Sequence, residues 1–229
     1  LNEATKPPDE TDKSLRVRSK KFSIFLNDNI FFKDESVLDL KFGLLKTDFR
    51  NNAIDNDYRQ SSANSFYSEV QFSNKLFYDI FTTQGLNFNY NIVNSKIYGD
   101  NDQIIGAGYW QVEWNGIKKL ILTAGIRLDY EKINKSEENI EFSPKIGANY
   151  KLFDYLNFRA SFGKGFRTAT IAEKFASLSF GPFKVKPNLN LIPEENYSTE
   201  LGVNYEFQIF HTLNSFDLSL FQNNLTNMI

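Results

Sequence analysis

The sequence contains no cysteine and only one histidine among its 229 residues. The absence of cysteine excludes disulfides, thiol nucleophiles and cysteine-ligated metals together. The single histidine, His211, lies in a predicted turn, so a nucleophile and its base would have to be built from carboxylates or lysine. We therefore expect no enzymatic activity, and no residue cluster indicates a resident metal or cofactor.

Long apolar runs are also missing. No segment approaches the roughly 20 apolar residues that a membrane helix needs, and the mean hydropathy is -0.42. The 26 basic and 28 acidic residues give a formal net charge of -2, which argues against nucleic-acid binding because that function requires a basic face. Neither observation excludes a membrane β-barrel, since half of each of its strands is polar.

Aromatic residues and regular alternation are what the sequence has in quantity, with 23 Phe and 11 Tyr. Residues 85–92 read GLNFNYNI, so apolar side chains and asparagines alternate with the period of a strand. In a soluble sandwich Leu86 and Phe88 would face a protein core. In a membrane barrel they would face lipid, and Asn87 and Asn89 would line the interior.

Ten alternating segments predict an all-β chain, and the connections between them decide its architecture. The segments are residues 22–32, 37–49, 66–76, 80–93, 104–114, 121–131, 141–152, 156–166, 197–207 and 215–224. Their connections alternate short and long, as in outer-membrane barrels with short periplasmic turns and long extracellular loops. A Greek-key sandwich would break that rhythm. We therefore predict part of a transmembrane, antiparallel, up-and-down β-barrel, with the asparagines on its inner wall.

The two faces of these segments support the same interpretation. Aromatic residues fall on the expected lipid face near both ends of the strands: Trp114, Tyr150, Phe207 and Phe216 beside short turns, and Phe66, Tyr130, Phe142 and Tyr197 near long loops. Such placement is expected of interfacial belts, and the general β-propensity of aromatic residues is the less favoured alternative. The opposite face carries charges of both signs, which indicates a wet lumen or a polar occupant: Glu69, Arg127, Asp129, Glu131, Arg159, Glu200 and Glu206.

One series of short motifs resembles a known family. Gly165-Phe166-Arg167 ends a predicted strand, a loop follows with Pro187-Asn188 and Pro193-Glu194, and Glu200-Leu201-Gly202 lies in the next strand. In this order and spacing, residues 108–207 resemble the barrel of TonB-dependent outer-membrane transporters. Gly165, Phe166, Pro187, Asn188, Pro193, Glu194, Glu200 and Gly202 are the residues that the resemblance assigns to structure.

The resemblance implies a 22-stranded barrel, wide enough to need a plug domain. It also implies contact with TonB through that plug and energy drawn from the inner membrane. About ten strands are visible here, so we expect residues 1–229 to be a barrel fragment without the plug and the C-terminal strands. The implied function is import of a scarce nutrient such as a metal–siderophore complex. The alternatives are a passive porin-type channel and, less favoured, an outer-membrane enzyme or adhesin.

The loop after Arg167 is the largest predicted extracellular feature. Its basic residues Arg167, Lys174, Lys184 and Lys186, together with Arg127 and Arg159 of the lumen, are candidates for binding an anionic ligand. The alternative is that Arg167, Pro187, Asn188 and Glu194 only hold the loop on the rim. Thr170 and Glu173 fit the capping box of a short helix through about residue 177. Haem importers of this family often place a histidine in this loop, and its absence lowers haem as cargo.

A basic run precedes the first segment from the outer side: Arg16, Arg18, Lys20 and Lys21. These residues could meet the phosphates of lipopolysaccharide by charge attraction, or they could belong to a solvated loop. The expected partners are therefore TonB, a small-molecule ligand, outer-membrane lipid and lipopolysaccharide, and not nucleic acid.

Overall fold

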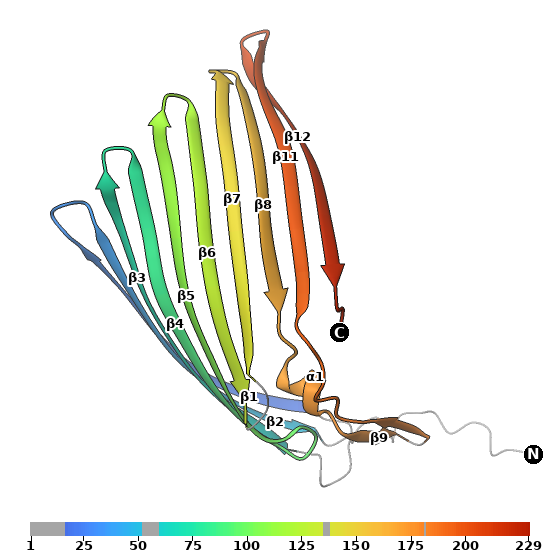
Figure 1. Ribbon diagram of the computed structural model, residues 1–229. Helices are drawn as coiled ribbons and strands as arrows, with labels where there is room; N and C mark the ends of the chain where they lie inside the picture. The colour runs from blue at the N-terminus through green and yellow to red at the C-terminus, as the bar shows by residue number, and fades with distance from the viewer. Residues whose placement is uncertain (1–16, 52–59, 135–137, 181) are drawn as a thin grey trace, which may run out of the picture.

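The computed structural model describes residues 17–51, 60–134, 138–180 and 182–229 (Figure 1). Ten long strands form one sheet: β1 (Val17–Phe31), β2 (Val37–Asn51), β3 (Gln60–Phe77), β4 (Ile80–Ser95), β5 (Gly99–Ile117), β6 (Leu120–Ile133), β7 (Asn139–Phe153), β8 (Leu156–Arg167), β11 (Glu194–Ile209) and β12 (Thr212–Thr226). Between β8 and β11 lie the helix α1 (Ile171–Phe175) and a small hairpin of β9 (Leu178–Phe180) and β10 (Phe183–Val185). Among the described residues, no helix has the length and apolarity to cross a bilayer.

Each long strand pairs antiparallel with the next, so the sheet is an up-and-down meander with β1 and β12 at its open edges. In Figure 1 the tight hairpins lie at the upper end of the curved sheet, and α1 and β9 lie at the lower end. The prediction of an antiparallel, partial barrel is confirmed.

The cross-strand register and the exposure of the side chains show where the apolar side of residues 85–92 faces. Leu86 lies opposite Val70 and Gly108, on a face where Leu86 is 69% exposed. Asn87 lies opposite Glu69, on the other face. No second sheet covers the apolar face in the described part of the chain, which excludes the sandwich. An apolar surface of this extent marks contact with a membrane or partner, and the predicted lipid face is therefore the exposed apolar one.

The strands are longer than predicted at the loop end. β3 begins at Gln60 rather than residue 66, and β5 spans Gly99–Ile117 rather than 104–114. The connection expected to be long after residue 93 is wrong, because only residues 96–98 separate β4 from β5. Polar cross-strand pairs extend the ladder beyond the apolar band: Asn91 donates a hydrogen bond to Gln103 over 3.0 Å. Hydrogen bonds between such polar side chains favour a continued strand pair over an open loop.

The described chain has a small apolar core, and it lies at the lower end of the sheet. Four of its five buried apolar residues lie there: Ile97, Ile133, Ala169 and Ile171. The backbone N–H of Ser177 donates to the carbonyl of Ile97 over 2.9 Å, so the segment after α1 is tied to the β4–β5 connection. The loop between β8 and β11 is thus fixed against the rest of the rim.

Candidate functional site

The inner face of β2–β5 carries a hydrogen-bonded network centred on Glu69. Its carboxylate lies 3.3 Å from the Lys41 ammonium and accepts hydrogen bonds from the hydroxyls of Tyr67 and Tyr109, the latter over 2.7 Å. The Tyr109 hydroxyl also lies 2.9 Å from the Gln71 side-chain oxygen. Only 12% of the Glu69 side chain is exposed, so these partners replace most of its hydration.

Gly85 makes room for this network. It lies opposite Tyr109 on β5, and a Cβ built on it would stand 2.4 Å from the Tyr109 hydroxyl oxygen and 2.5 Å from Cζ. The tyrosine therefore lies across the backbone of β4 to reach Glu69 on β3. Alternation identifies Glu69 and Gln71 as inward residues, but only the register reveals Tyr109 as their partner.

Arg127 continues the polar wall on β6. Its guanidinium donates three hydrogen bonds to Asp129, with lengths of 2.7–3.0 Å, and its Cζ lies 5.8 Å from the centroid of the Tyr109 ring. Further toward the loop end, Glu131 accepts hydrogen bonds from Gln103 and Asn139. The candidate Arg127 is thus neutralised by a neighbouring carboxylate and half-exposed to the inner side.

Arg159 on β8 reaches across two strands. Gly202 lies directly opposite it on β11, and a Cβ there would meet the guanidinium at 2.5–2.6 Å. Because that Cβ is missing, Arg159 contacts Glu200 at 3.1 Å and forms a two-pronged ion pair with Asp217 on β12 at 2.7 and 2.8 Å. Gly202 and Glu200, which the resemblance assigns to structure, are therefore placed around this arginine. Sequence reasoning missed Asp217, which is 58 residues away.

Arg167 holds the loop between β8 and β11, called the rim loop below, through ion pairs with two carboxylates. It bonds both oxygens of Glu194 at 2.9 Å and both oxygens of Glu173 at 2.9–3.0 Å. The predicted capping box is confirmed: the Thr170 hydroxyl accepts from the Glu173 N–H, and the Glu173 carboxylate accepts from the Thr170 N–H. These bonds, first of all the one from the Thr170 backbone, lower the pKa of Glu173. The helix ends at Phe175, two residues earlier than expected.

The remaining basic residues of the loop differ in placement. Lys174 is only 6% exposed, and its carbonyl accepts from the Asn188 N–H over 2.9 Å. Lys184 and Lys186 are exposed. Among the motif residues, Asn188 also accepts a hydrogen bond from Asn190, the Pro193 carbonyl accepts one from Asn227, and Pro187 is exposed beside Asn188.

Gly165 and Phe166 lie near the end of β8. Phe166 is half-buried opposite Glu195. A Cβ on Gly165 would meet nothing within 4 Å, so nothing in the structure explains that glycine.

The sequence offered no signal for Lys164, which joins three strands. The register between β7 and β8 ends at the pair Lys145 and Gly163, next to Pro144, whose ring nitrogen carries no hydrogen. Beyond that point Lys164 bridges Glu141 on β7 at 3.4 Å and Glu195 on β11 at 2.7 Å. Its side chain is only 15% exposed, and its two ion pairs connect β7, β8 and β11 where the backbone hydrogen bonds between β7 and β8 end.

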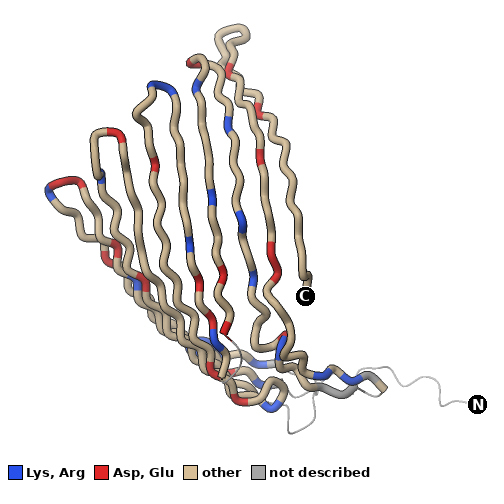
Figure 2. Tube along the Cα trace, viewed as in Figure 1, with Lys and Arg blue, Asp and Glu red and all other residues tan. Residues whose placement is uncertain are grey.

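The inner face of the sheet thus presents mainly ion pairs and amides, and few of its positions are apolar. Figure 2 shows acidic and basic residues side by side at the lower end of the sheet.

A family model described as "TonB dependent receptor-like, beta-barrel" matches residues 5–229. The chain belongs to this family. It is a family of outer-membrane receptors and transporters rather than of enzymes, which places the chain in the bacterial outer membrane.

Solved structures agree on the fold of this TonB-dependent receptor barrel. The hemophore receptor HasR of Serratia marcescens, a double mutant in complex with its hemophore HasA and heme, matches with a TM-score of 0.75 and 13% identity, over 93% of this chain and 40% of that chain. The siderophore receptor PirA of Pseudomonas aeruginosa matches with a TM-score of 0.73 and 18% identity, over 91% of this chain and 39% of that chain.

One curated relative matches in sequence. A probable hemoglobin and hemoglobin-haptoglobin-binding protein 4 of Haemophilus influenzae is 29% identical over 103 residues, which are 40% of this chain and 10% of the relative. The chain therefore spans well under half the length of the proteins that it matches.

Proposed function

We propose that the protein carrying this chain is an energy-coupled importer that takes up a large, scarce iron complex of the siderophore class. The family match carries the proposal, because it covers nearly the whole chain. The charged inner wall supports it as well: ion pairs such as Arg127–Asp129 and Arg159–Asp217 suit contact with a polar occupant of the lumen. The occupant proposed here is a plug domain outside these 229 residues, pulled by TonB.

The rim loop is the proposed first contact for the ligand. Lys184 and Lys186 are its exposed cations, and a ferric complex that carries carboxylates would meet them by charge attraction. Arg167 and Lys174 have another role in this proposal. Arg167 is held between two carboxylates and Lys174 is buried, so both position the loop. Arg127 and Arg159 then line the path below.

Haem is the second candidate cargo. It is favoured by the names of two similar proteins, the hemophore receptor and the hemoglobin-binding protein. Against it stands the absence of histidine from the rim loop. The only histidine, His211, lies in the tight turn between β11 and β12, at the opposite end of the strands. An iron–siderophore complex needs no axial ligand from the protein, which is why it is preferred.

Uptake in iron-starved cells tests the proposal. A Gram-negative host lacking its own receptors would express the full protein, and radiolabelled iron would be offered as ferric siderophores or as haem. We expect saturable uptake that disappears when TonB is deleted, and a higher half-saturation concentration for Lys184→Gln/Lys186→Gln. Lys151→Gln, at the opposite end of the strands, is the matched control. Uptake that rises linearly with concentration and ignores TonB would instead establish a passive channel.

A further inference from the structure

Two arginines lie directly opposite each other at the loop end of the sheet. Register pairs Arg18 of β1 with Arg50 of β2, and both side chains are exposed. Like charges at directly opposed positions destabilise a strand pair. Among the ion pairs of the described residues, none involves either arginine. Their juxtaposition calls for a negative charge that none of these ion pairs supplies.

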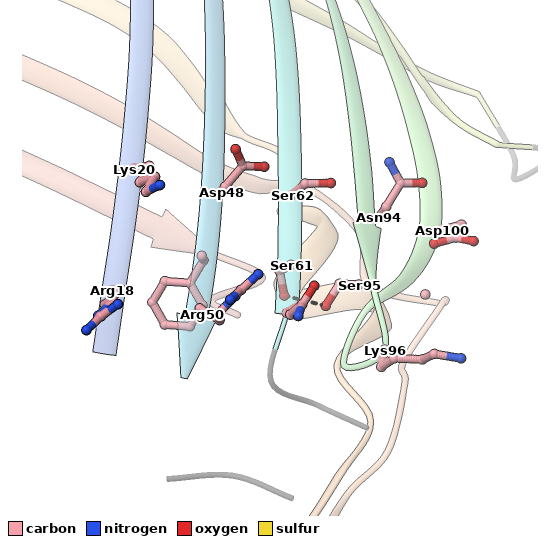
Figure 3. Close-up of a pocket in the computed structure, with 13 residues that line it drawn as sticks. Arg18, Lys20, Asp48, Arg50, Ser61, Ser62, Asn94, Ser95, Lys96 and Asp100 are labelled. Carbon is pink, nitrogen blue, oxygen red and sulfur yellow. Dashed lines mark hydrogen bonds between the residues drawn. The ribbon is translucent and has the colours of Figure 1, made fainter. Parts of the chain in front are cut away.

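The two arginines line a hollow of about 910 Å³ across the ends of β1–β5 (Figure 3). The hollow has four basic and two acidic residues in its lining: Arg18, Lys20, Arg50 and Lys96 against Asp48 and Asp100. Polar side chains complete the lining, and the hydroxyls of Ser61 and Ser95 are hydrogen-bonded over 2.8 Å. The lining is therefore cationic, and it is most so at Arg18 and Arg50.

The charged residues that β1 and β2 contribute to the hollow lie on the lipid-facing side of the sheet. Because side chains alternate, Arg18 and Lys20 share the face of Phe22 and Ile24, whereas Lys21 points to the inner face. Phe22 lies two positions after Lys20, which is about 7 Å along a strand. The cations thus begin where the apolar band ends, at the height expected of lipid headgroups. The opposite side of the same strands would be the place for a cargo-binding group.

We propose that this hollow binds the phosphate of an outer-leaflet lipid headgroup, as found in lipopolysaccharide. Arginine suits that role because its guanidinium donates two parallel hydrogen bonds to a phosphate. A bound phosphate would remove the repulsion between Arg18 and Arg50, and Lys20, on the same face of β1 as Arg18, adds a further positive charge to the hollow. The site refines the basic run found in the sequence: Arg18 and Lys20 belong to it, Lys21 does not, and Arg16 lies outside the described residues.

Lipid retention by the purified full protein tests the site. The protein would be equilibrated in detergent with bis-phosphorylated lipid A or with its dephosphorylated form, passed over a sizing column, and assayed for bound lipid. We expect the phosphorylated lipid to be retained in clear excess. Arg18→Gln/Arg50→Gln should weaken its binding about 25-fold, since each basic residue near an anionic surface contributes a factor of about five.

A pair of neighbouring variants makes the test independent of folding. Lys20→Gln and Lys21→Gln remove the same charge one residue apart, but on opposite faces, so only Lys20→Gln should reduce retention. Millimolar inorganic phosphate should leave the bound lipid in place. Equal retention of the two lipids, an equal loss in both lysine variants, or displacement by inorganic phosphate would each overturn the assignment; the last would indicate a site for a free anion.

Discussion

Replacing Gly85 with alanine should break the hydrogen-bonded network on the inner wall. The new methyl group would stand 2.4 Å from the Tyr109 hydroxyl oxygen and 2.9 Å from the backbone carbonyl of Val70. The tyrosine can rotate away, but it then loses the hydrogen bond that its single O–H donates to Glu69 over 2.7 Å. The change thus separates a partly buried carboxylate from one of its donors.

The expected cost follows from that bond. A hydrogen bond to a charged group contributes about 1.5–3 kcal/mol. Alanine regains roughly 0.5–1 kcal/mol over glycine within a strand. The net loss in unfolding free energy should therefore be about 1–2 kcal/mol. Urea unfolding of the barrel in lipid vesicles, followed by tryptophan fluorescence, measures it.

Two variants control this measurement. Gly106→Ala places a methyl group where nothing lies within 4 Å, so it should leave stability unchanged or raise it by about 0.5–1 kcal/mol. In a Tyr109→Ala background that hydrogen bond is already gone, and Gly85→Ala should then be nearly neutral. If Gly85→Ala proves as benign as Gly106→Ala, or costs the same with and without Tyr109, the proposed role of the glycine is wrong.

Three further predictions concern the other charge clusters. Gly202→Val should force Arg159 out of reach of Asp217, lowering the melting temperature as much as Asp217→Asn does, with no further loss in the double variant; additive losses would refute a shared cause. Thr170→Ala should weaken the cap of α1 by about 1 kcal/mol and speed proteolysis of the rim loop, whereas an unchanged cleavage rate would contradict it. Because the pKa of Glu173 is lowered in the folded protein, its contribution to loop stability is present above the usual glutamate range and is lost as the pH falls through that lowered pKa; cleavage should accelerate there in wild type and not in Glu173→Gln.

Much of the fold follows from local pattern. The period of two in residues 85–92 requires a strand with unlike faces, and the alternation of short and long connections between such segments predicts an antiparallel meander. The Thr170 to Glu173 spacing predicts its capping box because both bonds close within one helical turn. Strand ends were predicted less well, since polar residues such as Asn94 and Asp100 extend the ladder only when their neighbours are in register.

The sequence by itself determined the strands and their two faces, because alternation is a property of each segment alone, and the rhythm of the connections together with the motif series indicated the membrane setting. Only the tertiary structure decided which charges meet. Arg159 finds Asp217 across Gly202, Lys164 bridges Glu141 and Glu195, and Arg18 faces Arg50 because register sets these pairs. The physical reason is that a shift of one residue in register would move every side chain of a strand to the other face. That choice depends on all ten strands together.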